Sequence, residues 1–356
     1  MKKENSSREK ILQEKIDNFN PNESGSLCHG VFGLPFNVEE SKVVLVPVPW
    51  EVTVSYGEGT SSGPKSILDA SQQIDLYDPI YPDGWKEGIA MQDIPANIFY
   101  KSKQVREKVV NYISKYDEKE IDKNLQDEIN NDCNDLNVYV QETTAKLLKE
   151  DKIVGIVGGE HSVPLGYLEA LSEKYKNFGI LHIDAHSDLR NTYEGLTYSH
   201  ASIFYNALKI KNISKLVQVG IRDFCEEEFN FVKKNGKRVS LFTDYEIKKE
   251  IFKGKTLKRE FSKIVKELPK DVYISFDIDG LIPYLAPNTG TPVAGGFTVE
   301  EVAFLFEEII ASGRKIIGFD LCEVSPGENV NNQWDGNVGA RILYKLCLLT
   351  LKSQNK

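Results

Sequence analysis

Apolar residues in this chain form short continuous runs, separated by longer segments in which they recur at helical spacing. Seven runs predict strands buried on both faces, because continuous aliphatic and β-branched residues are typical of such strands. They cover residues 43–48, 153–157, 179–183, 216–219, 239–242, 272–276 and 315–321. The intervening segments predict helices over residues 63–72, 163–175, 201–208, 226–234, 255–268, 298–312 and 338–351. Strands alternating with helices predict an α/β fold with a mostly parallel sheet and helices on both faces.

Two stretches depart from this alternation. Residues 1–40 are polar and predict an N-terminal extension with a short helix, whereas residues 41–356 predict a single domain. Residues 100–150 are rich in lysine and acidic residues and predict a helical excursion before the second strand. We predict two helices in this excursion, separated by a polar hinge near residues 130–134.

Acidic side chains and imidazoles come directly after three of the predicted strands. The residues are His161, Asp184, His186, Asp188, Asp277 and Asp279. Because the carboxyl ends of parallel strands meet at one edge of a sheet, we expect these side chains to lie together. Charges grouped there repel one another unless a cation lies among them. Imidazole mixed with carboxylate suits Mn²⁺, Ni²⁺, Zn²⁺ or Fe²⁺, and four aspartates exceed the need of one ion. The pattern therefore favours two ions bridged by shared carboxylates.

Parts of this pattern also have plainer explanations. An aspartate after a strand is commonly a turn residue or a helix cap, and Asp277 with Asp279 alone fits either interpretation. Three acid-rich strand ends in one chain are harder to explain in that way, so we prefer the metal site. His182 lies two residues before Asp184 and hence on the same face of the predicted strand. We interpret it as a buried histidine behind the ligands.

The same segments resemble the metal-binding signatures of the ureohydrolase superfamily, which includes arginase, agmatinase, guanidine hydrolase and formimidoylglutamase. The resemblance rests on residues 57–67, 158–161, 184–188, 275–281, 290–296 and 323–326. Two positions depart from the common pattern: Glu160 replaces a frequent aspartate, and Ile282 stands where members often carry one. The resemblance implies a three-layer arginase-like fold, with helices on both faces of a mostly parallel sheet of about eight strands.

The resemblance also implies roles for individual residues. Two Mn²⁺ or Ni²⁺ ions would share six ligands. The first ion would take His161 and Asp188, the second His186 and Asp279, and the bridges would be Asp184 and Asp277. Asp188 would also accept a proton from the attacking water, and His200 would pass a proton to the leaving nitrogen. Glu323 would accept two N–H groups of the guanidinium in a fork. As plainer alternatives, His200 is a surface residue at a helix start and Glu323 an ordinary strand-end acid.

The implied reaction is hydrolysis of a C–N bond in a small guanidino compound to urea plus ammonia or an amine. Guanidine and agmatine are the favoured substrates. The alternatives are a formimidoylglutamase or an arginase acting on a carboxylate-bearing substrate, a single-metal amide deacylase, and a catalytically silent metal-binding scaffold. Arg190 either meets a substrate carboxylate or pairs with Glu194, and a nearby arginine disfavours a cationic tail. Aromatic residues expected near the mouth favour a small substrate: Trp50, Tyr56, Tyr193 and Tyr198.

The overall composition limits the classes of partner and location. The 356 residues carry a net charge of −9, and no basic stripe interleaved with aromatic residues predicts nucleic-acid binding. No apolar run reaches the ~18 residues of a membrane span, and residues 1–15 lack the apolar core of a secretion signal. Five scattered cysteines without CxxC spacing favour reduced thiols in a cytoplasmic protein. The resemblance also implies that the protein forms a homo-oligomer, either a trimer or a hexamer. His29 has no assigned role.

Overall fold

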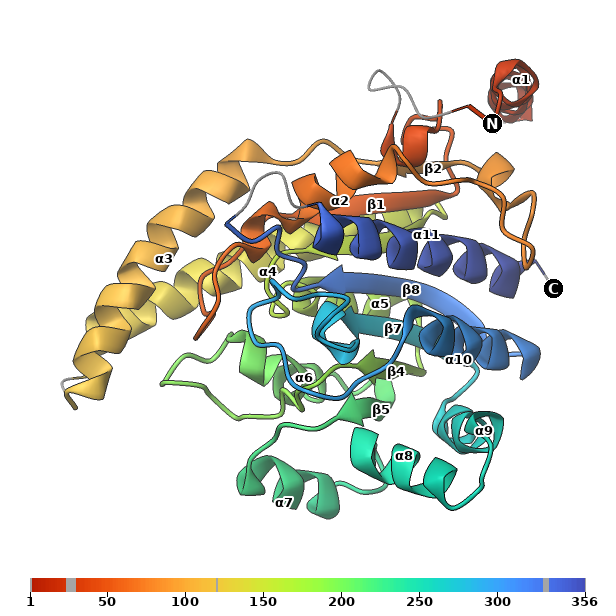
Figure 1. The fold of residues 1–356 in the computed structure, drawn as a ribbon. Helices are drawn as coiled ribbons and strands as arrows, with labels where there is room; N and C mark the ends of the chain where they lie inside the picture. Colours follow the sequence, from red (N-terminus) through yellow and green to blue (C-terminus); the bar gives the residue numbers. More distant parts are fainter. Residues whose placement is uncertain (1, 24–29, 120, 329–332, 356) are drawn as a thin grey trace.

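The computed structural model describes residues 2–23, 30–119, 121–328 and 333–355 (Figure 1). Cys28 and His29 lie outside the described residues. Eight parallel strands form one sheet in the order β2-β1-β3-β8-β7-β4-β5-β6. Their bounds are β1 Val43–Val48, β2 Ile89–Met91, β3 Ile153–Gly158, β4 Phe178–Ile183, β5 Ile213–Ile221, β6 Val239–Thr243, β7 Asp271–Asp277 and β8 Lys315–Cys322. The predicted α/β class and the sheet of eight strands are confirmed.

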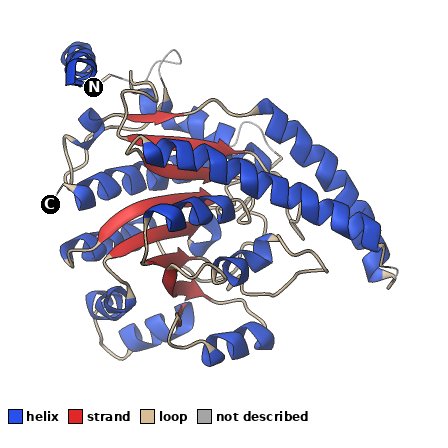
Figure 2. Cartoon of the chain, turned by 180° about the vertical axis from the view of Figure 1, so that it is seen from behind, coloured by secondary structure: helices blue, strands red, loops and turns tan. Residues whose placement is uncertain are grey.

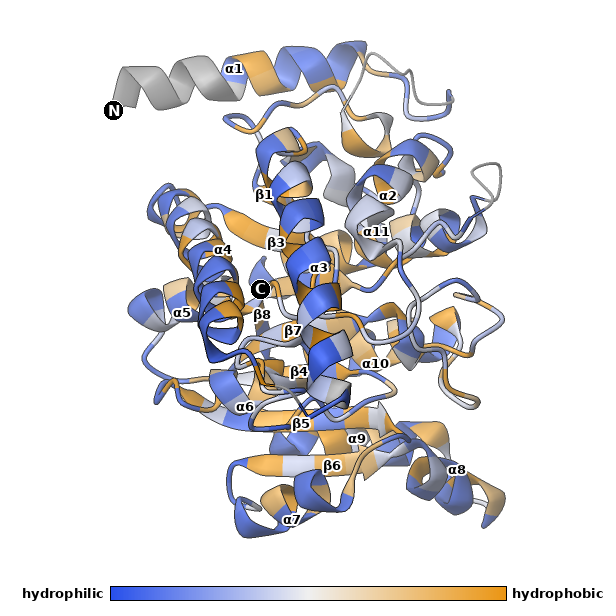
Figure 3. Ribbon diagram, turned by 90° about the vertical axis from the view of Figure 1, so that its left-hand side faces the viewer, coloured by the Kyte–Doolittle hydropathy of each residue, from blue (hydrophilic) through white to orange (hydrophobic). Residues whose placement is uncertain are grey.

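Helices cover both faces of the sheet (Figure 2). Neighbouring residues of a strand point to opposite faces, so Val43 and Leu45 join one apolar cluster and Val44 and Val46 the other. The first cluster packs the sheet against α2 (Gly63–Ser71), α8 (Asp244–Phe252), α9 (Leu257–Glu267), α10 (Val299–Ala311) and α11 (Trp334–Gln354). The second packs it against α3 (Ala96–Asp117), α4 (Lys123–Lys149), α5 (Leu165–Lys174), α6 (Ile203–Ala207) and α7 (Glu226–Lys234). The exposed sides of α3 and α4 are largely polar (Figure 3).

Most predicted helices and strands agree with the observed ones within a few residues, and α7 agrees at both ends. The apolar pattern does not predict β2 or α8. β2 has only three residues, too few for a recognisable apolar run. α8 follows β6 without a loop, and the Thr243 side chain caps it by accepting the Glu246 N–H. No described helix is long and apolar enough to cross a membrane.

The two helices of the excursion are confirmed, but the predicted position of their hinge is wrong. α3 ends at residue 117 and α4 begins at residue 123, so residues 130–134 lie inside α4. The Asp122 side chain caps α4 at its true start. Asn130 does not form a turn. Its Oδ1 atom makes a tertiary contact by accepting the backbone N–H of Thr197 at 2.8 Å.

Residues before position 41 take part in the core. α1 (Lys2–Asn18) leads toward a segment in which Val31, Phe32, Leu34 and Phe36 are all buried in the first cluster. Core-forming residues therefore begin earlier in the chain than the polar composition suggests. The division into an extension at 1–40 and a domain at 41–356 stays a prediction.

Candidate active site

Four adjacent strands bring the predicted site residues to one edge of the sheet. In the order β3-β8-β7-β4, His161 follows β3, Glu323 follows β8, Asp277 ends β7 and Asp184 follows β4. Parallel strands all end on the same edge, so residues far apart in the sequence meet there. A turn of 3₁₀ helix, Ile278–Gly280, then carries Asp279, whose N–H is accepted by Asp277 Oδ1 at 2.9 Å.

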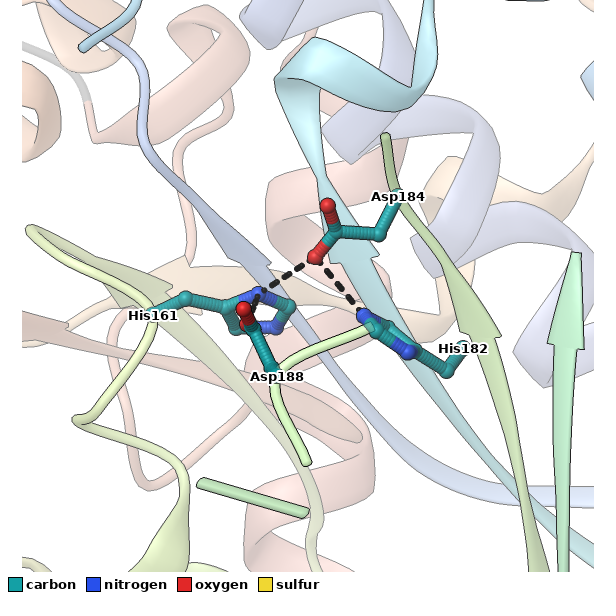
Figure 4. A group of neighbouring side chains, drawn as sticks. All are labelled: His161, His182, Asp184 and Asp188. Carbon is teal, nitrogen blue, oxygen red and sulfur yellow. Dashed lines mark hydrogen bonds and ion pairs between the residues drawn. The ribbon is translucent and has the colours of Figure 1, made fainter. Parts of the chain in front are cut away.

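His161 faces three of the predicted acidic ligands. Its Nδ1 atom lies 3.1 Å from Asp184 Oδ2, 3.2 Å from Asp277 Oδ2 and 3.5 Å from Asp188 Oδ2. Figure 4 shows His161, Asp184 and Asp188 pointing toward one another. All four side chains are buried, so water does not screen the carboxylate charges from one another.

His186 faces the remaining acidic ligand. Its Nδ1 atom lies 3.0 Å from Asp279 Oδ2 and 3.4 Å from Asp184 Oδ1. Asp184 thus turns Oδ2 toward His161 and Oδ1 toward His186. Asp184 therefore presents a different oxygen to each of these two imidazoles.

The pKa values of both histidines are shifted by these acids. Burial alone would lower the pKa of His161, but hydrogen bonds to Asp184, Asp188, Asp277 and Asp320 raise it well above its usual value. Burial would also lower the pKa of His186, but its acidic neighbours raise that pKa to about 12. The protein alone therefore offsets the negative charge of this cluster by holding protons on its imidazoles.

The pKa values of the carboxylates in the cluster shift in opposite directions. Burial, and then the negative charge of Asp184, raise the pKa of Asp188 to about 7. Burial and the charges of Asp279 and Asp184 raise the pKa of Asp277 well above its usual value. Burial opposes the ionisation of Asp184 too, but three imidazoles hold its pKa well below the usual range. A cluster that gathers protons in this way has more negative charge than its histidines can balance, which suits bound cations.

Two predicted site residues have strained backbones. Asp188 has φ +53° and Glu323 has φ +63°, both in the left-handed region that residues with a Cβ atom seldom adopt. Such strain costs of order 1–3 kcal/mol, persists only where the surroundings impose it, and is concentrated at functional sites. The observation supports a functional role for both loops.

Glu323 and Glu160 hold the loops around His161. Glu323 Oε1 accepts the backbone N–H of His161 at 2.7 Å, which turns the buried carboxylate toward the cluster. Glu160 Oε2 accepts the backbone N–H groups of Val52 and Thr53 at 2.9 and 2.7 Å. It thereby ties the loop after β1 to the end of β3.

His200 contacts the same loop after β1. Its Nδ1 atom is 3.1 Å from Thr53 Oγ1, and its ring meets the Tyr193 ring edge-on at 5.8 Å. Burial, together with the positive charges of His186 and His161, lowers the pKa of His200 to about 3. The imidazole is therefore neutral at physiological pH.

A pocket of about 180 Å³ opens beside the cluster. Six predicted site residues line it: His161, His186, Asp188, His200, Asp277 and Glu323. Arg190, Tyr193 and Asp223 line it as well, so its wall carries a cation, an aromatic ring and an acid. Of the other aromatic residues expected at the mouth, none lines this pocket. Trp50 is buried and Tyr56 is 84% exposed.

Two buried residues behind His161 are missing from the sequence prediction. Ser275 Oγ lies 2.9 Å from His161 Nε2 and donates its hydrogen to Asp320 Oδ2 at 2.7 Å. Because that hydrogen is used, the Ser275 oxygen accepts the Nε2–H of His161. Nδ1 is then the nitrogen that can bind a metal ion, and it is the one that faces the acids. The available signal is that Ser275 and Asp320 are polar residues within otherwise apolar strands.

Comparison with known proteins identifies the family. The model of the Arginase family matches residues 41–349. The chain belongs to the Arginase family. This membership confirms the resemblance seen in the sequence.

Individual relatives and a solved structure support the same assignment. The chain is 31% identical over 307 residues to the N(1)-aminopropylagmatine ureohydrolase of Thermus thermophilus, covering 86% of this chain and 89% of that protein. It is 31% identical over 288 residues to an agmatinase of Bacillus cereus, covering 81% and 85%. The crystal structure of the agmatine ureohydrolase of Thermoplasma volcanium has the same fold, with a TM-score of 0.68 and 24% identity over 96% of this chain and 98% of that one.

The potential metal ligands of this Arginase-family chain fall into overlapping groups. Within the described ranges, ligand atoms within 4.8 Å of one another occur in three groups: His161, His182, Asp184 and Asp188; Asp184, His186 and Asp279; and His161, Asp320 and Cys322. Asp184 belongs to the first two groups, and each of these contains nitrogen and oxygen donors. The cluster therefore suits divalent transition-metal ions.

Proposed function

We propose that this Arginase-family protein is a ureohydrolase that cleaves the C–N bond of a small guanidino compound, giving urea and ammonia or an amine. The observation that carries the proposal is the position of Asp184. One of its oxygens faces His161 and the other faces His186, as two neighbouring metal ions would require. The relatives named agmatinase and N(1)-aminopropylagmatine ureohydrolase support the same reaction class.

We assign the metal ligands as the family resemblance implies them, so that each chain would hold two divalent ions, either Mn²⁺ or Ni²⁺. The ligands are His161 and Asp188 for one ion, His186 and Asp279 for the other, and Asp184 and Asp277 as bridges. The Nδ1 atom of His161 fits this assignment, because Ser275 accepts the proton on Nε2 and leaves Nδ1 for an ion. Two divalent ions held in this way supply Lewis-acid chemistry that makes water nucleophilic near neutral pH.

The remaining site residues orient the substrate and move protons. Glu323 accepts N–H groups of the guanidinium, which places the central carbon beside the cluster. Asp188 accepts the proton that the attacking water loses. His200 is neutral, so its imidazole takes up a proton before passing it to the leaving nitrogen. Its place on the pocket wall supports this role.

The pocket favours a small substrate. Its volume of about 180 Å³ is below the ~300–1,000 Å³ typical of sites for larger ligands. Guanidine and agmatine are the substrates we favour. A carboxylate-bearing guanidino compound is the second candidate, because Arg190 lines the pocket, with its guanidinium carbon 5.2 Å from the Tyr193 ring centre. Asp223 on the same wall would instead attract a cationic tail.

The proposal is tested by a substrate panel. Protein loaded with Mn²⁺ or Ni²⁺ is incubated with guanidine, agmatine, 4-guanidinobutyrate, arginine and formiminoglutamate, and urea and formamide are measured. Urea from a guanidino compound, with metal-free protein inactive, is the expected result. Formamide from formiminoglutamate would show a formimidoylglutamase. No product from any compound at full metal occupancy would indicate a silent scaffold and overturn the proposal.

We extend the proposal to location and assembly. Four cysteines, Cys133, Cys225, Cys322 and Cys347, are free thiols, which supports a cytoplasmic protein. The homo-oligomer, as a trimer or hexamer, rests on the family resemblance alone. Light scattering of the purified protein would determine it.

A further inference from the structure

A chain of buried hydrogen bonds lies behind Asp184, and the proposed reaction does not use it. His182 is fully buried in β4, with its Nε2 atom 2.7 Å from Asp184 Oδ2 (Figure 4). Its Nδ1 atom lies 3.0 Å from Gln218 Nε2 on the neighbouring strand β5. Residues 182 and 218 are partners in the parallel register of β4 and β5, so the sheet itself fixes this contact.

The partners of Gln218 determine which way its amide points. Gln218 Nε2 lies 2.6 Å from the backbone oxygen of Ser187, and Gln218 Oε1 lies 3.1 Å from Ser187 Oγ. A flipped amide would place its oxygen against that backbone oxygen, and two acceptors at this distance repel each other. The amide nitrogen therefore donates one hydrogen to Ser187 and the other to His182 Nδ1.

This orientation fixes the tautomer of His182. A neutral imidazole has one N–H group and one lone pair on its ring nitrogens. Since Nδ1 accepts from Gln218, the proton lies on Nε2 and is donated to Asp184 Oδ2. Phe204 packs on the ring with the two centroids 4.0 Å apart, which holds the plane of the imidazole. Nδ1 faces an amide donor and Nε2 carries the proton donated to Asp184, so we read His182 as a donor to Asp184 and not as a ligand.

We infer that His182 is a positioning residue of the metal centre, whose Nε2–H orients the Asp184 carboxylate while Gln218 fixes its tautomer. The inference rests on the proposed function, in which Asp184 bridges two ions. A bridging carboxylate must keep each oxygen turned toward its ion, and a fixed donor opposes its rotation. Each oxygen has two lone pairs, so Oδ2 can accept this hydrogen and still bind an ion.

Metal binding by two His182 variants tests the inference. Mn²⁺ is titrated calorimetrically into metal-free protein. His182→Phe keeps a ring of similar size but removes the donor, and Mn²⁺ affinity should fall by about 10- to 100-fold. His182→Gln places an amide N–H group near the position of Nε2, and affinity should recover in large part. Thr144→Val is the control, because it removes a buried hydrogen bond within α4 and should bind Mn²⁺ as the wild type does.

The tautomer itself gives a second readout that general loss of packing would not produce. In metal-free protein labelled with ¹⁵N-histidine, NMR should show the His182 proton on Nε2, with the signal assigned by its loss in His182→Phe. Gln218→Leu cannot donate to Nδ1 and adds no charge, so the tautomer is no longer fixed and Mn²⁺ affinity should fall. This variant keeps the test open if His182→Phe does not fold.

Two results would overturn the inference. One is a proton on Nδ1 in place of Nε2 in the wild-type protein, and the other is Mn²⁺ affinity in His182→Phe or Gln218→Leu equal to that of the wild type. Neither measurement depends on turnover. A wild-type protein that binds two Mn²⁺ ions but releases no urea would therefore refute the proposed function without refuting the role of His182.

Discussion

Glu323→Gln probes how the guanidinium is bound. In the wild-type chain, Glu323 Oε1 accepts the His161 N–H at 2.7 Å, and the backbone N–H of Glu323 is held by the Gly159 oxygen at 2.8 Å. Glutamine has the same size, and its side-chain oxygen can keep the bond to His161. Its NH₂ group then points toward the pocket. A guanidinium has only N–H donors, so donors would face donors and the fork would be lost.

The size of the effect follows from the bonds that are lost. A hydrogen bond to a charged group contributes ~1.5–3 kcal/mol, so losing two costs ~3–6 kcal/mol. At ~1.4 kcal/mol for each tenfold change, kcat/KM should fall by about two to four orders of magnitude. The number of bound metal ions should not change, because Glu323 is not an assigned ligand.

Urea release at low substrate concentration gives kcat/KM, and elemental analysis of the same sample gives the metal content. Glu260→Gln serves as the matched control. It neutralises a buried acid on α9 that pairs with Lys263 and does not line the pocket. If Glu323→Gln stays within tenfold of the wild type at full metal occupancy, Glu323 does not bind the guanidinium. If the variant loses metal, Glu323 is itself a ligand.

Four other perturbations have defined outcomes. Asp277→Ala should lose at least one ion and nearly all activity, and full occupancy by elemental analysis would contradict its bridging role. Mn²⁺ affinity should rise with pH between 6 and 9, because the pKa of His186 is about 12 and its proton must leave before an ion binds. Calorimetry in buffers of different ionisation enthalpy counts these protons, and a pH-independent affinity would refute the argument. His200→Asn should lower turnover at least about tenfold at every pH from 6 to 9. The shape of the pH–rate profile should not change, since a pKa of about 3 keeps His200 neutral throughout this range. A flattened pH–rate profile would show that His200 titrates. Arg106→Ala removes hydrogen bonds of 3.1 and 2.8 Å to two backbone oxygens of the loop at 52–54. That variant should raise KM and speed proteolysis of the loop while metal content stays constant, and an unchanged KM would mean that the loop does not need this anchor.

Seven of the eight strands were predictable because they appear as apolar runs, whereas β2 is too short to do so. The positions of the helix ends in the excursion were not. Residues 130–134 resemble a turn in composition, yet Asn130 bonds to Thr197. That contact joins segments far apart in the sequence. Val31 and Phe32 lie in a short apolar stretch, residues 31–36, inside a segment that is polar overall, and they are buried in the first cluster.

In the candidate site too, some residues could be predicted from the sequence and others could not. The acids and imidazoles at the strand ends could be found because they follow apolar runs and parallel strands end together. Ser275, Asp320 and Gln218 lie inside strands, where their roles depend on which strand is the neighbour. The strand order places Ser275 beside Asp320 and Gln218 beside His182. Local patterns along the chain do not specify that order.

Anomalous diffraction from crystals grown with Mn²⁺ tests the central claim most directly. The account predicts two peaks about 3.5–4 Å apart at the carboxyl edge of the sheet. One should lie beside His161 and Asp188, the other beside His186 and Asp279, with the Asp184 carboxylate between them. A single peak, or two peaks away from this edge, would contradict the two-ion centre.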